Sequence, residues 1–455
     1  MASRTLRFPP GFVWGAATSA YQVEGATRAA GKGESIWDRF VKQPGAILHG
    51  DTGAQACNSF DPAQLEIDLG LIARLGPGAY IFSIQWPRIQ PRGRGRAREA
   101  GLDYYRRLVD GLLARGVTPV ATLYHWELPQ ALQDEGGWAS RDTVDRFADY
   151  AGIVGKALAD RVPAWVTQNE PATSSWLGYG EGKHAPGLRG AGNALRAAHH
   201  LLLSHGRATR RLRAAAGARP LGIGPVLNLV PLRPASPGVA DRRATSRRDG
   251  EQNRFFLDAL FRGRYPADVR RRHRKATRDF AFVRAGDMAE IATPIDFLGV
   301  NYYRSDRVAA GPGGEPEVRP PDGPATAMGW AIDPPALGTL LRELQRSHTG
   351  ELPLIVSENG ASFRDYVDPE GRCRDPERID FLKRHLQEAH RAVADGVPLK
   401  GFFVWSLLDN FEWDSGYRER FGLVHVDYPT QRRTPKASFE WYRQTIRANA
   451  VERAR

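Results

Sequence analysis

The segment Pro353-Leu354-Ile355-Val356-Ser357-Glu358-Asn359-Gly360 decides the fold that we expect for this chain. Its short run of Leu, Ile and Val predicts a strand that is buried on both faces, as in a parallel sheet. The run stops at a carboxylate, an amide and a glycine, so Glu358 should stand where the strand leaves the sheet. In parallel α/β folds this carboxyl-terminal edge carries the chemistry. Taken alone, however, a Glu after a strand is more often solvated or placed at a helix start.

A second segment of the same design indicates that Glu358 belongs to a site. Ala164-Trp165-Val166-Thr167-Gln168-Asn169-Glu170-Pro171 is also a short strand-like run that ends in a carboxylate beside an Asn. Two strand ends built alike are typical of a functional pair. We therefore expect Glu170 and Glu358 to meet at one edge of one sheet.

Strand-like runs alternate with helical patterns along the whole chain. Segments such as 102–113 and 379–393 place apolar residues at helical spacing. This alternation indicates βαβ units and a parallel sheet. Eight units predict an α/β fold, a single (β/α)8 TIM barrel with long loops at its C-terminal mouth, and one domain over residues 1–455. The expected strands are 12–17, 80–84, 118–124, 165–167, 221–227, 295–301, 354–357 and 401–407.

Glycine and proline mark the less certain parts of this assignment. The strand 221–227 is the weakest of the eight because it is rich in glycine. The Pro- and Gly-rich tracts 231–238 and 311–324 follow the fifth and sixth strands. We expect both tracts to be loops at the mouth rather than linkers between domains.

Composition sets limits on the class of protein. The chain has 455 residues, of which 42% are hydrophobic, so it can form a large core. No run is long and apolar enough to cross a membrane, and residues 1–8 lack the apolar stretch of a signal peptide. Cys57 and Cys373 are far apart and form no metal-ligand pattern. We expect a soluble, reduced, cytoplasmic protein.

The net charge of +13 does not by itself indicate a nucleic-acid partner. Arginines are scattered over helical segments such as 207–213, and the pairs at 242–243 and 247–248 fall in what we expect to be a Pro- and Gly-flanked loop. The sequence has no recognition motif and no basic-aromatic array of the kind found in nucleic-acid modules. A solvated, Arg-biased surface explains the charge better.

Several of the expected strand ends carry groups that hold sugars. Sugars present apolar C–H faces and equatorial hydroxyls, so a site for them needs aromatic platforms beside amides and carboxylates. Each such residue alone is more often a structural or core residue, but many converge on one edge here. They are Tyr21-Gln22, His125-Trp126, Asn301-Tyr302-Tyr303, Trp405 and Asp409-Asn410-Phe411-Glu412-Trp413.

Two carboxylates inside such a ring suit glycoside hydrolysis. One must be ionised to act as a nucleophile, and the other must hold a proton at working pH, which requires a raised pKa. This chemistry requires no cofactor. A metal site is unsupported, because neither a His-x-x-x-His pair nor a compact carboxylate cluster occurs in the sequence.

The sequence also resembles the glycoside hydrolase family 1 β-glucosidases over almost its entire length. Residues 8–25 are similar to the family's N-terminal signature. Thr167-Gln-Asn-Glu-Pro171 and Ser357-Glu-Asn-Gly360 are similar to its acid/base and nucleophile motifs. Residues 405–413, with Arg420-Phe-Gly422, are similar to its C-terminal sugar-binding segment. The resemblance implies one glycoside hydrolase catalytic domain.

The resemblance also implies a role for each site residue. Glu170 is the general acid/base and Glu358 the nucleophile. Tyr303, with Asn301 nearby, hydrogen-bonds around the nucleophile, and Asn228 and Trp330 line the more variable leaving-group side. The residues expected to bind the non-reducing sugar are Gln22, His125, Trp126, Asn169, Trp405, Glu412 and Trp413.

This chain departs from the family pattern at several positions. Gln168 replaces the usual Leu, Glu127 replaces an Asp, and Ala172 stands where a Trp is frequent, which predicts a wider entrance. The segment 58–85 diverges most. There Ile81 occupies the place of an Arg near the nucleophile, on the strand face that Ser83 and Gln85 share. The difference bears on rate and pH optimum rather than on the class of reaction.

We therefore expect a retaining exo-β-glycosidase that acts on small β-glucosides or cello-oligosaccharides. Glucose is the expected sugar, with galactose or fucose as alternatives. One rival is a 6-phospho-β-glucosidase, whose phosphate-binding Ser and Lys stand near the positions of Glu412 and Trp413; a carboxylate there would repel the phosphate. A second is a carbohydrate-binding pseudoenzyme. The presence of both glutamates argues against a pseudoenzyme, whereas the missing Arg at position 81 keeps this alternative open.

Overall fold

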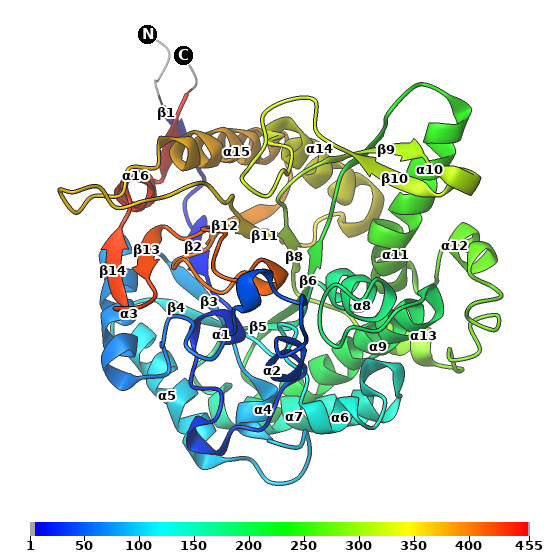
Figure 1. Cartoon of the computed structure of the whole chain (residues 1–455), viewed down its shortest axis with the longest axis horizontal. Helices are drawn as coiled ribbons and strands as arrows, with labels where there is room; N and C mark the ends of the chain where they lie inside the picture. Colours follow the sequence, from blue (N-terminus) through cyan, green and yellow to red (C-terminus); the bar gives the residue numbers. More distant parts are fainter. Residues whose placement is uncertain (1–4, 454–455) are drawn as a thin grey trace.

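The computed structural model describes residues 5–453 and contains a closed barrel of eight parallel strands (Figure 1). The order around the ring is β11-β12-β2-β3-β4-β5-β6-β8, so the first and last barrel strands in the chain, β2 and β12, are neighbours. All eight expected strands are confirmed, with ends shifted by a few residues. Their bounds are Val13–Ala17 (β2), Ala79–Ser83 (β3), Thr118–Thr122 (β4), Ala164–Asn169 (β5), Gly222–Asn228 (β6), Leu298–Asn301 (β8), Leu354–Asn359 (β11) and Leu399–Trp405 (β12).

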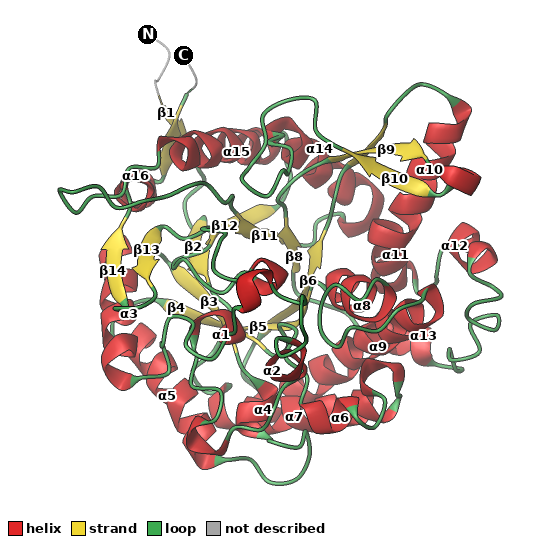
Figure 2. Ribbon diagram, viewed as in Figure 1, coloured by secondary structure: helices red, strands yellow, loops and turns green. Residues whose placement is uncertain are grey.

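Helices surround the barrel, as Figure 2 shows. The longer ones are α3 (Pro62–Leu75), α5 (Glu99–Leu113), α7 (Asp142–Leu158), α9 (Ala191–Ala216), α10 (Val239–Asp249), α11 (Phe255–Arg262), α14 (Pro334–Leu344), α15 (Pro376–Ala394) and α16 (Ala437–Ala448). Helix α3 illustrates how sequence sets the bounds. Asp61 accepts hydrogen bonds from the N–H groups of Ala63 and Gln64, Pro62 takes the first helical position, and Gly76 ends the helix with a φ of 72°.

Shorter helices lie in the connections between these elements. They are α1 (Ala20–Val23), α2 (Ile36–Phe40), α4 (Trp86–Ile89), α6 (Gln130–Gln133), α8 (Pro171–Ser175), α12 (Ala267–Arg272) and α13 (Asp287–Ile291). Helix α1 directly follows β2 and α8 directly follows β5, so both begin at the carboxyl ends of barrel strands.

Apolar side chains fill both sides of the barrel wall. Inside the ring, Val120, Val166, Val226 and Phe403 form one cluster, against which Ile81 packs. Tyr80 and Phe82, the neighbours of Ile81 on β3, belong instead to the large cluster between strands and helices. This alternation places Ile81 on the interior face, as the strand period predicts.

Within residues 5–453, three small sheets lie outside the barrel. β1 (Thr5–Arg7) pairs with β15 (Ala450–Glu452), and β13 (Val424–Asp427) pairs with β14 (Arg432–Pro435). The third sheet has the order β10-β9-β7, formed by Pro316–Arg319, Asp306–Ala310 and Leu232–Pro234. The Pro- and Gly-rich tracts 231–238 and 311–324 therefore contribute strands, and the prediction that they are only loops was incomplete.

The expectation that the arginine pairs at 242–243 and 247–248 lie in a loop was wrong. They belong to helix α10, in which Ala244 is the one buried residue. A helix without an apolar stripe gives no periodic signal in the sequence. Tertiary contacts stabilise it instead, since Asp241 accepts a hydrogen bond from the backbone N–H of Ala310 on β9 at 2.8 Å.

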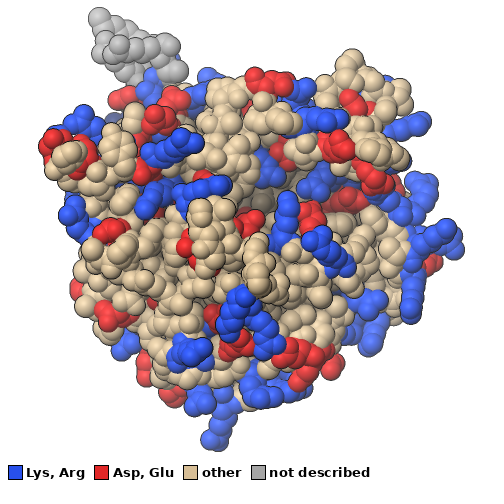
Figure 3. Space-filling view, in the orientation of Figure 1, with Lys and Arg blue, Asp and Glu red and all other residues tan. Residues whose placement is uncertain are grey.

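The surface carries both signs of charge. On the face seen in Figure 3, Lys and Arg side chains are interspersed with Asp and Glu, although the net charge is +13. None of the helices within residues 5–453 combines the length and the apolar composition needed to cross a membrane.

Candidate active site

A cavity of about 290 Å³ collects most of the predicted site residues at the mouth of the barrel. Its wall includes His125, Trp126, Glu170, Asn228, Tyr303, Trp330, Glu358, Trp405, Glu412 and Trp413. The other predicted residues lie directly behind this wall. Gln22 donates a hydrogen bond to Glu412, Asn169 contacts His125, and Asn301 donates to Glu170. The structure therefore brings the whole predicted set together.

Glu170 is held at the junction of β5 and α8. It precedes Pro171, the first residue of the helix, and adopts a left-handed backbone conformation with a φ of 50°. Its Oε1 accepts from the Asn301 amide at 2.7 Å, and its Oε2 accepts from Thr173 at 2.8 Å and from Asn228 at 3.2 Å. These contacts fix the carboxyl group, which is buried.

Glu358 is the penultimate residue of β11 and is also buried. The phenol of Tyr303 donates a hydrogen bond to its Oε2. Asn301 stands opposite Glu358 in the β8–β11 register and lies against both glutamates. No Lys or Arg within residues 5–453 forms an ion pair with either Glu170 or Glu358.

Burial raises the pKa of both glutamates above that of an ordinary carboxyl. For Glu358 the nearby charge of Glu170 raises the pKa further, while the Tyr303 hydrogen bond opposes the rise. Two carboxyl groups that repel each other in a low-dielectric site titrate as a coupled pair. Over a range of pH above the usual carboxyl pKa, the pair therefore holds one proton and one negative charge.

A chain of hydrogen bonds orients the amides beside the glutamates. Ser357 donates to Oδ1 of Asn301 at 2.8 Å, and the Asn301 amide donates to Oδ1 of Asn169 at 3.2 Å. The amide nitrogen of Asn169 then faces Nε2 of His125 at 3.1 Å. Burial lowers the pKa of His125 to about 3, so the ring is neutral and can accept at Nε2 while it carries its proton on Nδ1. In this arrangement the nitrogen of each amide donates and its oxygen accepts.

Glu412 lies at the inner, polar end of the cavity, and Gln22 lies behind it. Nε2 of Gln22 donates to Asn410 at 2.9 Å and to Glu412 at 3.3 Å. Burial, together with neighbouring carboxylates, raises the pKa of Glu412 to about 8. The indole of Trp413 stacks on Tyr21 with an interplanar angle of 7° and packs against Trp126 at 4.4 Å between ring centroids. Polar groups beside aromatic faces are suited to a sugar.

A buried ion-pair network holds the segment that carries Glu412 and Trp413. Asp409 accepts from Lys436 and from Arg420, each at 2.7 Å, and from the backbone N–H of Gly422 at 2.9 Å. These opposite charges keep the pKa of Asp409 low despite its burial. The network ties the loop after β12 to residues near the end of the chain.

The outer end of the cavity contains residues that the sequence did not single out. Trp176, Arg248, Gln252 and Arg304 line it together with Trp330. Ala172 lies in the same wall, in the place where a wider entrance was expected. Thr173, which binds Glu170, could have been found from its position three residues after that glutamate, a spacing typical of side chains that meet at a helix start. No sequence pattern indicated that Arg248 belongs to the site, because helix α10 was not predicted.

Gln85 does not reach the site. Its Nε2 donates to Glu24 at 2.8 Å, and Glu24 in turn pairs with the buried Arg88 at 2.9 Å. The residue has left the strand by this point, since it immediately precedes helix α4. Ile81 does face inward and packs against the cluster that contains Tyr303 and Trp405.

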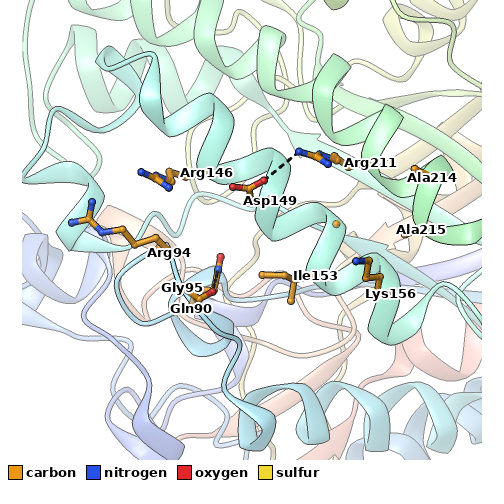
Figure 4. Close-up of a pocket in the computed structure, with 12 residues that line it drawn as sticks. Gln90, Arg94, Gly95, Arg146, Asp149, Ile153, Lys156, Arg211, Ala214 and Ala215 are labelled. Carbon is orange, nitrogen blue, oxygen red and sulfur yellow. Dashed lines mark hydrogen bonds and ion pairs between the residues drawn. The ribbon is translucent and has the colours of Figure 1, made fainter.

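A second hollow, of about 560 Å³, lies between α7, α9 and the segment 90–95, and Figure 4 shows its lining. Its acidic residue Asp149 forms an ion pair with Arg211 at 3.4 Å. The hollow contains no pair of carboxylates and no aromatic platform among its lining residues. Nor does any group of three His, Cys, Asp or Glu between residues 5 and 453 have the arrangement of a metal site.

Known proteins match this chain over nearly its full length. The model of Glycosyl hydrolase family 1 matches residues 4–451. Beta-glucosidase A of Acetivibrio thermocellus is 43% identical over 449 residues, which cover 98% of this chain and 99% of that protein. The bifunctional beta-D-glucosidase/beta-D-fucosidase of Bifidobacterium breve is 45% identical over 465 residues, covering 97% and 98% respectively. The solved family 1 β-glucosidase from Thermotoga maritima superposes with a TM-score of 0.94 at 43% identity, covering 99% of this chain and 100% of that one.

Proposed function

The chain belongs to glycosyl hydrolase family 1, whose enzymes are retaining glycosidases, and we propose that it removes terminal β-linked glucose from small β-glucosides and cello-oligosaccharides. The observation that carries this proposal is the pair of buried glutamates, Glu170 and Glu358, joined through Asn301 in one cavity. The names of the relatives support glucose as the sugar.

In the first step Glu358 attacks the anomeric carbon while Glu170 protonates the departing oxygen. The two roles require one proton and one negative charge between the two glutamates, which a pair of buried, mutually repelling carboxyl groups can hold. Tyr303 donates to Glu358 and orients its carboxylate. Asn228 and Thr173 hold Glu170 on the side where the leaving group must depart. The bond between sugar and leaving group breaks as the glycosyl–Glu358 ester forms.

In the second step the ionised Glu170 takes a proton from water, which attacks the same carbon and releases Glu358. Two inversions give net retention at the anomeric centre. The product carries the sugar in its original β configuration, and each carboxyl group returns to its starting state.

The inner end of the cavity selects an unmodified sugar. Gln22, His125 and Glu412 supply hydrogen-bonding groups, and Trp405 and Trp413 supply apolar faces. Glu412 offers a carboxyl group where a 6-phosphate would need a cation. Fucosides, which lack a 6-hydroxyl, fit the same pocket, in line with the name of the Bifidobacterium breve relative.

The remaining proposals concern the setting of the reaction. Residues 1–455 form one catalytic domain, consistent with a single barrel that includes the helices and the small sheets around it. The enzyme acts in the cytoplasm. Cys57 and Cys373 are both buried and free, as suits a reducing compartment.

The test follows the anomeric proton of glucose by NMR while 4-nitrophenyl β-glucoside is hydrolysed. β-Glucose should appear first and then mutarotate. If α-glucose appeared first, the retaining mechanism would be refuted for this chain. The control is Glu358→Gln, which preserves size and should lower kcat by more than a thousandfold because an amide cannot attack. A variant with nearly full activity would exclude Glu358 as the nucleophile.

A further inference from the structure

Arg248 stands out among the charged residues that line the active-site cavity. It lies on the last turn of helix α10 and is half-buried. Among residues 5–453 its guanidinium forms no ion pair and no hydrogen bond. Its Nε atom is buried without a partner. A guanidinium carries five N–H donors, so this side chain leaves its full binding capacity unused.

The other charged groups of the outer wall are paired within the protein. Lys183 lies 3.9 Å from Glu181, and His184 lies 3.4 Å from Asp414. Arg304 forms an ion pair with Asp306 at 2.7 Å and lies over the ring of Trp330 at 5.0 Å. Among the described residues of this wall, Arg248 is therefore the cation whose charge no carboxylate neutralises.

Arg248 lies at the end of the cavity where the leaving group must be. Gln252, one turn further along the chain, donates to the backbone carbonyl of Asn228 at 3.3 Å, and the Asn228 side chain binds Glu170. The indole N–H of Trp176 donates to the carbonyl of Glu251 at 3.3 Å. The segment that follows Arg248 is thus fastened to the acid/base side of the site.

We propose that Arg248 recognises a carboxylate on the leaving group, so that the enzyme prefers aryl β-glucosides whose ring bears a carboxylate. This inference rests on the proposed glucosidase activity and names the substrate class of its leaving-group side. Trp176 and Trp330 line the same end and offer faces for an aromatic ring. The two oxygens of a planar carboxylate can accept two parallel hydrogen bonds from one guanidinium group. A dianionic phosphate is disfavoured, because Arg248 is the one unpaired cation of the described wall and would balance a single negative charge.

The test compares kcat/KM for 4-carboxyphenyl and 4-carbamoylphenyl β-glucosides, which differ in charge but little in shape. The ratio of the two values is measured for the wild type and for Arg248→Met. Differences in leaving-group chemistry between the two substrates cancel when the ratios are compared. Loss of a charge-assisted contact should lower the carboxylate/amide ratio about tenfold. Arg248→Lys, which keeps the charge, should recover part of the ratio.

The matched control is Arg243→Met. Arg243 is an exposed arginine of the same helix that is absent from the cavity wall, so this variant removes the same charge from the surface. Its ratio should equal that of the wild type. An unchanged ratio in a folded Arg248→Met variant, or an equal fall in both Met variants, would overturn the proposal. Failure of the glucosidase activity itself would look different, since the wild type would then hydrolyse neither substrate.

Discussion

Replacing Ile81 with arginine should extend the activity of the enzyme to lower pH. Glu358 must be ionised to attack, and burial together with Glu170 raises its pKa. The structure gives Glu358 the Tyr303 phenol and the nearby Asn301 amide, but no cation within residues 5–453 pairs with it. Ile81 faces the barrel interior and packs in the cluster that contains Tyr303. An arginine at this position can reach toward the carboxylate.

The size of the shift follows from the charge that arginine adds. An opposite charge within about 4–6 Å lowers a carboxyl pKa by about 1–3 units. We take a pKa shift of about 1 unit. At a pH one unit below the present pKa of Glu358, the ionised fraction of this carboxyl group would then rise from about one-eleventh to about one-half. The value of kcat/KM at that pH should then rise about fivefold, because it follows the ionised fraction of the free enzyme.

The assay is the pH profile of kcat/KM on 4-nitrophenyl β-glucoside for the wild type, Ile81→Arg and Ile81→Met. The methionine variant controls for the change in side-chain length without adding charge, and circular dichroism with thermal melting confirms that each variant folds. The acid limb should move to lower pH in Ile81→Arg alone. If the limb stays in place in a folded Ile81→Arg variant, Tyr303 and Asn301 already hold the carboxylate ionised and the reasoning is wrong.

Three further predictions concern other parts of the molecule. Glu358→Gly should lose hydrolysis, and azide should restore turnover with an α-glycosyl azide as product by NMR; a β-azide would contradict the nucleophile assignment. Glu170→Gly should retain far more kcat/KM on a 2,4-dinitrophenyl glucoside than on a methyl glucoside, because only the poor leaving group needs a proton; equal losses would count against the acid role. Lys436→Met should lower the free energy of unfolding in urea by about 3–5 kcal/mol, since it removes one of the two cations that neutralise each of the buried carboxylates Asp365 and Asp409. Lys383→Met, which removes a more exposed pair, should cost about 1 kcal/mol or less; similar losses in both variants would refute this.

Periodicity was sufficient to predict the barrel because buried parallel strands leave a strong local signal. Even the weakest prediction, 221–227, is confirmed as β6. Its glycines weakened the strand pattern, yet the fold requires one of them, since a Cβ at Gly224 would collide with the carbonyl oxygen of Phe297. Helix α10 and the β10-β9-β7 sheet could not be predicted in this way. They are stabilised by contacts with one another rather than by an apolar face of their own.

The same distinction separates the site residues that could be predicted from the sequence from those that could not. Residues at strand ends, such as Glu170, Asn301 and Glu358, could be placed from the sequence because a parallel barrel brings its carboxyl ends together. Arg248 could not, since it reaches the cavity from a helix in a long excursion after β6. The orientation of Gln85 also depends on tertiary structure, because a chain turn after β3 directs it to Glu24.

The pairing of β2 with β12 has a consequence for how the protein is made. Residues 13–17 emerge from the ribosome well before their partner, residues 399–405, because most of the barrel lies between them in the chain. The contact between Gln22 and Asn410 spans the same interval. A nascent chain therefore exposes the open edge of β2 until residues 399–405 have emerged, and such edges favour aggregation. Sugar-binding capacity should arise only after residues 399–410 have emerged, when ring closure joins the two halves of the binding pocket.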